Sequence, residues 1–395
     1  MEKRKKLRLF WIEKGTATLG YLAGVTSLLI LFLWKLSSLV PLLTREYISL
    51  QNSSTLSKIF ANPIYAPYKI VQLSVHYVFK QNVLYHRMVS VLFALLVVGL
   101  FYFILRYWYS MRIAIMGTVL LACSSWFLHL AREATPLITQ TALLAVIAYG
   151  IWARYNQKLG LIMLIGCLLA AGLIYIPGFI WLVVVAATWQ RSIITRSLKK
   201  APVLSIISLL IFVLLTLPII RAASQNINIA FDLAGLPKIH ELDYQGMLNR
   251  GINIPKQLLW QGYPDASLWL PGTPILDVFV GVMACLGLYV YINKWSLDRI
   301  KLVLGGGFIA TLLIIIGGKV YLAALLPLIY LAAASGIAFM IQQWQTVFPN
   351  NPLASRLGVL MMALVVTASC FYQLNHYFIA WPQSPQTKSG FHLRH

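Results

Sequence analysis

A series of apolar blocks constrains this chain more than any other feature of its sequence. Each block approaches the ~20 residues that a helix needs to cross the ~30 Å hydrocarbon core of a bilayer. Hydrophobic residues make up 59% of the chain and charged residues 11%, against about 25% charged residues in an ordinary soluble protein. A soluble fold could not bury so much apolar surface.

The blocks predict an all-α polytopic membrane protein, in which residues 1–395 form a single membrane domain with about eleven transmembrane helices. The predicted spans are residues 17–40, 84–106, 111–130, 136–153, 159–175, 177–190, 201–220, 274–292, 300–317, 320–341 and 357–376.

The distribution of basic residues predicts the orientation. The N-terminal segment 1–16 is dense in Lys and Arg, which indicates a cytoplasmic N-terminus. Eleven spans then place the C-terminal tail, residues 377–395, outside the cell, in an integral protein of the plasma membrane. The net charge of +22 is explained by basic residues that flank spans, so nucleic acid is not expected as a partner.

One connection between predicted helices decides the orientation of all later spans. Pro177-Gly178 either separates two short spans or kinks a single long one, and the single-span alternative would invert everything downstream. The basic cluster that follows favours two spans, because it marks a cytoplasmic connection. Its members are Arg191, Arg196, Lys199 and Lys200.

Only two segments on the expected outer side are long. The first outer loop, residues 41–83, contains amphipathic runs after Ser53 and from Pro67 to Phe79, which predict helices lying in the membrane interface. The second, residues 221–273, is polar and aromatic. Most carboxylates fall on this side and the spans contain almost none, so any chemistry is expected at the outer surface.

Glu46 is the first candidate for a catalytic residue. It lies a few residues beyond the first predicted span, where a carboxylate could take a proton from an acceptor hydroxyl or amine. The alternative is an interfacial acid that pairs with Arg45. Glu133 and Asp265 are secondary candidates on the same side.

Three cations lie at outer ends of predicted spans, where a lipid phosphate would lie. They are Arg87, Arg132 and Lys319. Guanidinium suits phosphate because it offers paired donors. The alternative for each is ordinary snorkelling toward lipid headgroups.

No metal site is predicted. His76, His86 and His129 have no metal-type spacing, and the four cysteines lie inside apolar blocks. The sequence identifies no cofactor and leaves dependence on a divalent metal open.

The order of the motifs resembles a known family. After the first span come Glu46, the two interfacial runs, and a span that opens with His86-Arg87. An Arg106-Tyr107 turn and the motif Ser125-Trp126-Phe127, followed by Arg132, come next. This order resembles the C-type integral-membrane glycosyltransferases (GT-C superfamily), in the branch of the protein O-mannosyltransferases and aminoarabinose transferases.

The resemblance is best over residues 40–155 and returns at Trp269–Asp277 and Lys319–Pro327. It implies a GT-C-like fold and transfer of a sugar from a polyprenyl-phosphate donor at the outer face of the membrane. Glu46 would be the base, and Arg87, Arg132 and Lys319 would bind the donor phosphate. Donor and membrane lipids are the expected partners, and the sequence names neither the sugar nor the acceptor.

Two departures keep alternatives open. Relatives usually carry Asp-Glu where this chain has Arg45-Glu46, and many carry Asp at the position of Leu137. A relative that has lost catalysis and acts as an assembly partner is therefore a second hypothesis. A transporter or flippase of lipid-linked substrates is a third, although its spans should contain more polar residues.

Overall fold

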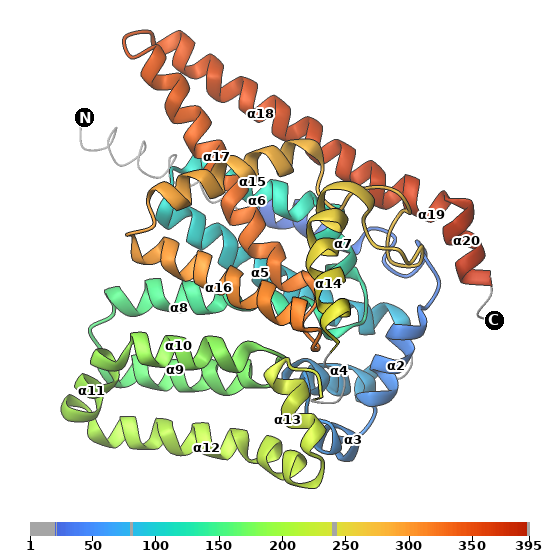
Figure 1. The fold of residues 1–395 in the computed structure, drawn as a ribbon, viewed down its shortest axis with the longest axis vertical. Coiled ribbons are helices and arrows are strands. Elements are labelled where there is room, and N and C mark those ends of the chain that lie inside the picture. The colour runs from blue at the N-terminus through green and yellow to red at the C-terminus, as the bar shows by residue number, and fades with distance from the viewer. Residues whose placement is uncertain (1–19, 21, 80–81, 239–242, 393–395) are drawn as a thin grey trace, which may run out of the picture.

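The computed structural model describes residues 20, 22–79, 82–238 and 243–392, and within these ranges the chain is helical and contains no β-strand. Figure 1 shows the long helices lying roughly along one direction, with shorter helices gathered at one end of them. The prediction of an all-α polytopic membrane protein is confirmed.

Among the described residues, six helical stretches are long and apolar enough to cross a membrane on their own. They are Val83–Trp108, Pro136–Tyr155, Pro202–Gln225, Arg299–Ile316, Leu322–Val347 and Pro352–Gln383. A seventh, Met111–Arg132, is bent by 62°. Four shorter apolar helices complete the set: Leu22–Leu33, Leu159–Ile174, Phe179–Trp189 and Val278–Asn293. Each of the predicted spans overlaps one of these stretches. The predicted cytoplasmic segment 1–16 and the start of the first predicted span, residues 17–19 and 21, lie outside the described residues.

The longer helices carry the labels of Figure 1 from here on. They are α5 (Val83–Trp108), α6 (Met111–Cys123), α7 (Ser125–Arg132), α8 (Leu143–Tyr155), α9 (Leu159–Ile174), α10 (Phe179–Trp189), α11 (Arg191–Lys200), α12 (Pro202–Gln225), α15 (Val278–Asn293), α16 (Asp298–Ile316), α17 (Leu326–Val347) and α18 (Pro352–Asn375).

Pro177-Gly178 separates two helices. Gly178 has φ of 81°, a left-handed conformation that glycine adopts without strain. Helix α9 ends before this turn and α10 returns beside α9 (Figure 1). The two-span alternative is therefore the one that the structure adopts.

The helical core depends on small residues. Helix α17 is the most buried of the long apolar helices, and α15 packs closely along it. A Cβ atom added to Gly287 would lie 1.8 Å from the carbonyl oxygen of Ala332, and one added to Gly336 would lie 2.1 Å from that of Met283. Close helix contact through small residues is typical of membrane proteins.

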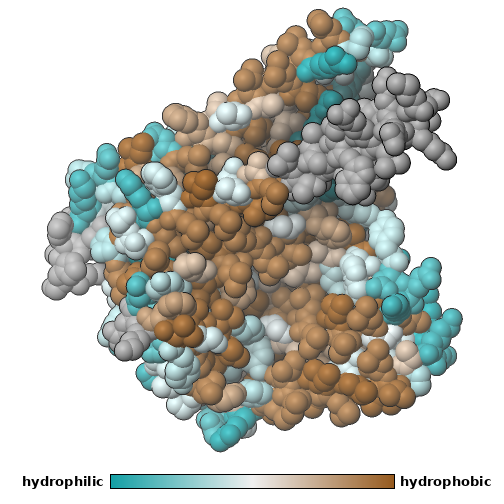
Figure 2. All heavy atoms as spheres, turned by 180° about the vertical axis from the view of Figure 1, so that it is seen from behind, coloured by the Kyte–Doolittle hydropathy of each residue, from teal (hydrophilic) through white to brown (hydrophobic). Residues whose placement is uncertain are grey.

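The outer surface of the helices is apolar. Figure 2 shows hydrophobic side chains across the broad middle of one face, with hydrophilic side chains toward its edges. This distribution fits a bilayer around the middle of the helices.

The first outer loop contains three helices: α2 (Thr44–Asn52), α3 (Leu56–Ala61) and α4 (Ala66–Phe79). Helices α3 and α4 coincide with the two predicted amphipathic runs, whereas α2 was not predicted. Helix α4 packs against α5, and α3 packs against α12. This loop is therefore a structured layer over one end of the spans.

The second outer loop and the C-terminal tail pack together. The loop forms α13 (Ile227–Ala234) and α14 (Tyr244–Lys256), and the tail continues through a π-helical turn (His376–Ala380) into α19 (Trp381–Gln383) and α20 (Pro385–His392). The Trp381 indole donates to the carbonyl of Ala266 at 3.1 Å, and the Thr387 hydroxyl donates to it at 3.3 Å.

Candidate functional site

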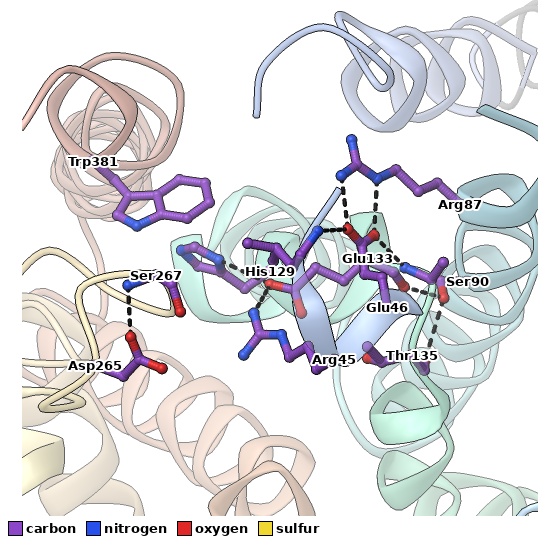
Figure 3. A network of polar contacts seen from close by, with 12 residues as sticks. Arg45, Glu46, Arg87, Ser90, His129, Glu133, Thr135, Asp265, Ser267 and Trp381 are labelled. Carbon is purple, nitrogen blue, oxygen red and sulfur yellow. Dashed lines mark hydrogen bonds and ion pairs between the residues drawn. The ribbon is translucent and has the colours of Figure 1, made fainter. Parts of the chain in front are cut away.

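A buried carboxylate stands at the centre of the candidate site (Figure 3). Glu46, in the first turn of α2, is 0% exposed. One oxygen accepts from Arg87 Nε at 2.9 Å and from the Ala134 amide at 2.8 Å. The other accepts from Arg87 Nη2 at 2.8 Å and from the Leu43 amide at 2.9 Å. Both oxygens are thus fully engaged.

Arg87 is equally saturated. It is 2% exposed, and its Nε and Nη2 both bond Glu46. Its remaining donors reach the carbonyls of Leu36, Val40 and Pro41, at the end of the first helix. All five guanidinium donors are used, so none is left for a lipid phosphate.

These contacts correct two expectations about the same pair of residues. Glu46 was expected at the water interface, and Arg87 was expected to face a headgroup phosphate. The structure buries both, because a guanidinium and a carboxylate satisfy each other in two parallel bonds. The pair fixes α2 to the start of α5, and we assign it a structural role.

A second carboxylate beside this pair is not saturated. Glu133, directly after α7, forms an ion pair with Arg45 through Oε1, and His129 Nδ1 lies 3.4 Å from the same oxygen. No described residue donates a hydrogen bond to Oε2. The expected pairing of Arg45 with Glu46 is therefore wrong, since Arg45 pairs with Glu133.

The backbone and charge of Glu133 are held in place. Its carbonyl accepts from the Ser90 hydroxyl, and the next amide, of Ala134, donates to Glu46. Burial raises the pKa of Glu133, but the charge of Arg45 and the contact with His129 outweigh burial, so that the pKa lies below its ordinary value. Glu133 is thus a carboxylate that stays ionised at neutral pH.

Arg132 is buried as well. Its Nη atoms donate to the carbonyls of Leu31 and Trp34. Its guanidinium carbon lies 5.3 Å from the ring centroid of Tyr377 and 4.7 Å from that of Phe378. Arg132 is buried at 3% exposure. It therefore joins the first helix to the C-terminal tail, and its role at a donor phosphate stays a prediction.

Lys319 is the one candidate cation of the three that is exposed. Its side chain is 49% exposed and pairs with Asp232 at 2.7 Å. The nearby Lys69, on α4, is buried and donates to the carbonyl of Asn62 at 2.8 Å. Burial and the charge of Lys319 lower the pKa of Lys69 to about 8.

A buried glutamine, Gln140, joins the backbone around Lys319 to the segment that follows Glu133. Gln140 donates to the Tyr65 hydroxyl at 2.8 Å and to the Lys319 carbonyl at 3.0 Å, and it accepts from the Tyr321 amide at 2.9 Å. The 3₁₀ turn that holds Gln140 (Pro136–Thr141) begins three residues after Glu133. Asp265, by contrast, is exposed, and one of its oxygens caps the Ser267 amide.

His129 lies in an aromatic enclosure. Its ring centroid is 5.3 Å from Trp269, 4.8 Å from Tyr377 and 4.3 Å from Trp381. The C-terminal tail thus contributes directly to the surroundings of Glu133. Among the residues that the structure describes, no group of three or more His, Cys, Asp or Glu side chains could hold a metal ion.

Several of these residues were missed by sequence reasoning. Gln140 lies inside a predicted span, and a polar residue there is a functional signal in itself. Lys69 interrupts an amphipathic run, which was a weaker signal. Tyr377 and Trp381, in the C-terminal tail, gave no such signal in the sequence. Their contact with His129 depends on the path of the whole chain.

The fold and site define a polytopic all-helical membrane protein with a buried polar centre at one end of its helices. No family model matches the chain, and no curated protein matches its sequence. Among solved structures, the chain is similar to the crystal structure of ArnT from Cupriavidus metallidurans in the apo state. The identity is 12% and the TM-score 0.48, over 95% of this chain and 77% of that one.

Proposed function

We propose that this protein is a GT-C-type glycosyltransferase, which moves a sugar from a polyprenyl-phosphate donor to an acceptor at the outer face of the plasma membrane. The order of motifs along residues 40–155 supports the family. One observation carries the chemistry: Glu133 keeps a carboxylate oxygen without a donor among the described residues, beside the fully bonded pair of Glu46 and Arg87. Glu133 therefore replaces Glu46 as the proposed base.

The reaction divides the polar residues into two groups. Glu133 Oε2 takes the proton from the acceptor hydroxyl or amine, which attacks the anomeric carbon of the sugar. The bond from this carbon to the phosphate oxygen breaks, and polyprenyl phosphate leaves with the electron pair. Lys319, with Lys69 behind it, stabilises the negative charge of the leaving phosphate.

Lys319→Gln is expected to weaken binding of a polyprenyl-phosphate sugar by about 10- to 100-fold, the range for one hydrogen bond to a charged group. Titration of the purified protein with a fluorescent polyprenyl phosphate measures this. The matched control is Lys58→Gln, an exposed lysine of α3, which should bind as the wild type does. Equal binding by all three proteins would place the phosphate elsewhere.

Donor binding should also depend on pH through Lys69. With a pKa of about 8, Lys69 is cationic below that pH and neutral above it. Affinity for an anionic phosphate is therefore expected to fall as the pH rises through about 8. Lys69→Met should remove this step, and Lys58→Met should retain it. A wild-type affinity that is flat between pH 7 and 9 would contradict the role of Lys69.

The proposed orientation has its own test. Single cysteines at Ser384 and Ser192, in a chain whose four native cysteines are replaced by Ser, should react with an impermeant maleimide from opposite faces. We expect Ser384→Cys to react from outside and Ser192→Cys only after the membrane is opened. Reaction of both from one face would contradict a cytoplasmic N-terminus with an external C-terminus.

A relative without catalysis is the second candidate. Arg45, at a position where relatives usually carry an acid, binds the carboxylate that would have to act as base. In that case Arg45, Glu46, Arg87 and Glu133 would serve only to hold the first outer loop in place. The protein would then act as an assembly partner. Turnover of any polyprenyl-phosphate sugar by the purified protein separates the two candidates.

A further inference from the structure

A cavity of about 660 Å³ lies between α8, α10 and α16, at the end of the spans away from Glu133. Its lining includes Trp108, the last residue of α5, and Trp189, the last of α10. Glu46 and Arg87 lie by the opposite end of α5. The cavity is therefore separate from the candidate site, and by the proposed orientation it faces the cytoplasm.

The cavity lies where three helices of the bundle stay apart. Within the described residues, none of the pairs that α8, α10 and α16 form with one another makes an extensive contact. Gly150 and Gly305 line the cavity from two sides. A Cβ atom at either glycine would meet nothing within 4 Å. The space is thus open, whereas neighbouring helices of the core are tightly packed.

The mouth of the cavity is basic. Among the residues whose side chains the structure describes, its lining contains four basic ones, Arg154, Arg196, Arg299 and Lys301. All four side chains are exposed. The guanidinium of Arg299 also lies 5.9 Å from the ring centroid of Trp108. A cluster of exposed basic side chains at the mouth of an apolar cavity suits an anionic group.

The deeper walls are apolar and continue along the spans. Leu143, Leu182, Gly306 and Ile309 line both this cavity and a smaller one that reaches Gly178 and Val320. An apolar seam therefore runs from the basic mouth toward the other end of the helices. A soluble anion would use only the mouth, whereas a lipid would use both the mouth and the seam.

We propose that this cavity is a binding site for an anionic phospholipid of the cytoplasmic leaflet. The phosphate headgroup contacts Arg196, Arg299 and Lys301, and an acyl chain lies in the seam between α8, α10 and α16. Basic pockets between membrane helices on the cytoplasmic side are suited to such headgroups. The proposal stands on residues that the transfer reaction does not use.

Native mass spectrometry of the purified protein tests the headgroup contact, with phosphatidylglycerol and phosphatidylcholine of identical acyl chains as probes. We expect the wild type to retain phosphatidylglycerol preferentially. Arg299→Gln with Lys301→Gln should weaken that binding about 25-fold, since one cation near a membrane surface contributes about fivefold. The control, Lys199→Gln with Lys200→Gln, removes the same charge from exposed positions of α11 outside the cavity lining and should bind as the wild type does. Equal retention of both lipids, or an equal loss in the control, overturns the proposal.

A second pair of variants tests the seam. Gly305→Leu fills the cavity and should lower retention of phosphatidylglycerol, whereas Gly99→Leu, at an open position of α5, should not. Inorganic phosphate should fail to protect the wild type against thermal unfolding at concentrations at which phosphatidylglycerol protects. Unchanged lipid binding by Gly305→Leu, or equal protection by inorganic phosphate, contradicts an acyl chain in the seam.

Discussion

Glu133→Gln is expected to lower the rate of sugar transfer by about 10²–10⁴-fold, the usual contribution of a general base. Glutamine keeps the size and one acceptor oxygen of Glu133 but cannot take a proton. Binding of the donor lipid should change little, because its phosphate is assigned to Lys319 and Lys69. The measurement is a comparison of initial transfer rates and donor affinities for purified wild type and variant.

The pH profile adds an independent check on Glu133. Because the pKa of Glu133 lies below its ordinary value, the wild-type rate should fall only at pH values below the usual glutamate range. Arg45→Gln removes the nearest charge that lowers this pKa, and should shift the acid limb of the profile to higher pH. An acid limb that does not move would mean that another group acts as the base.

The second large effect concerns stability. Arg87→Leu leaves the buried carboxylate of Glu46 without its partner, and breaking such a pair typically costs about 3–5 kcal/mol. We expect a marked loss of folded protein in a thermal denaturation series followed by size-exclusion chromatography. The combination Arg87→Leu with Glu46→Leu should recover much of the loss, because it removes both charges together.

A half-exposed ion pair provides the matched control for this experiment. Lys319→Leu breaks the pair with Asp232, which solvent screens, so its cost should stay within about 1 kcal/mol. If Arg87→Leu proves as mild as Lys319→Leu, the pair between Glu46 and Arg87 does not hold the first outer loop in place.

The positions of the helices could be predicted from sequence because membrane spans are set by the length of apolar blocks. Even the break at Pro177-Gly178 was indicated by the basic residues that follow it. The shorter helices α3 and α4 were visible as amphipathic runs. Helix α2 was missed, because nine residues of mixed character carry too little periodicity to identify.

The pairing of the outer charges could not be predicted in the same way. Arg45 and Glu46 are neighbours in sequence, and pairing them was the simplest assumption. Successive residues of a helix do not face each other, so Glu46 turns toward Arg87 while Arg45 reaches Glu133. The bend of 62° between α6 and α7 lies just before His129 and Glu133, and no apolar pattern encodes its direction.

The most direct test of the account is turnover with a labelled donor. Purified wild type is incubated with polyprenyl-phosphate sugars of several kinds, each labelled in the sugar, together with membranes of the source organism as the supply of acceptor. We expect that one donor releases polyprenyl phosphate in amounts equal to the label transferred, and that Glu133→Gln releases almost none. Release by Glu133→Gln at the wild-type rate, or no release from any donor that the wild type binds, would contradict it.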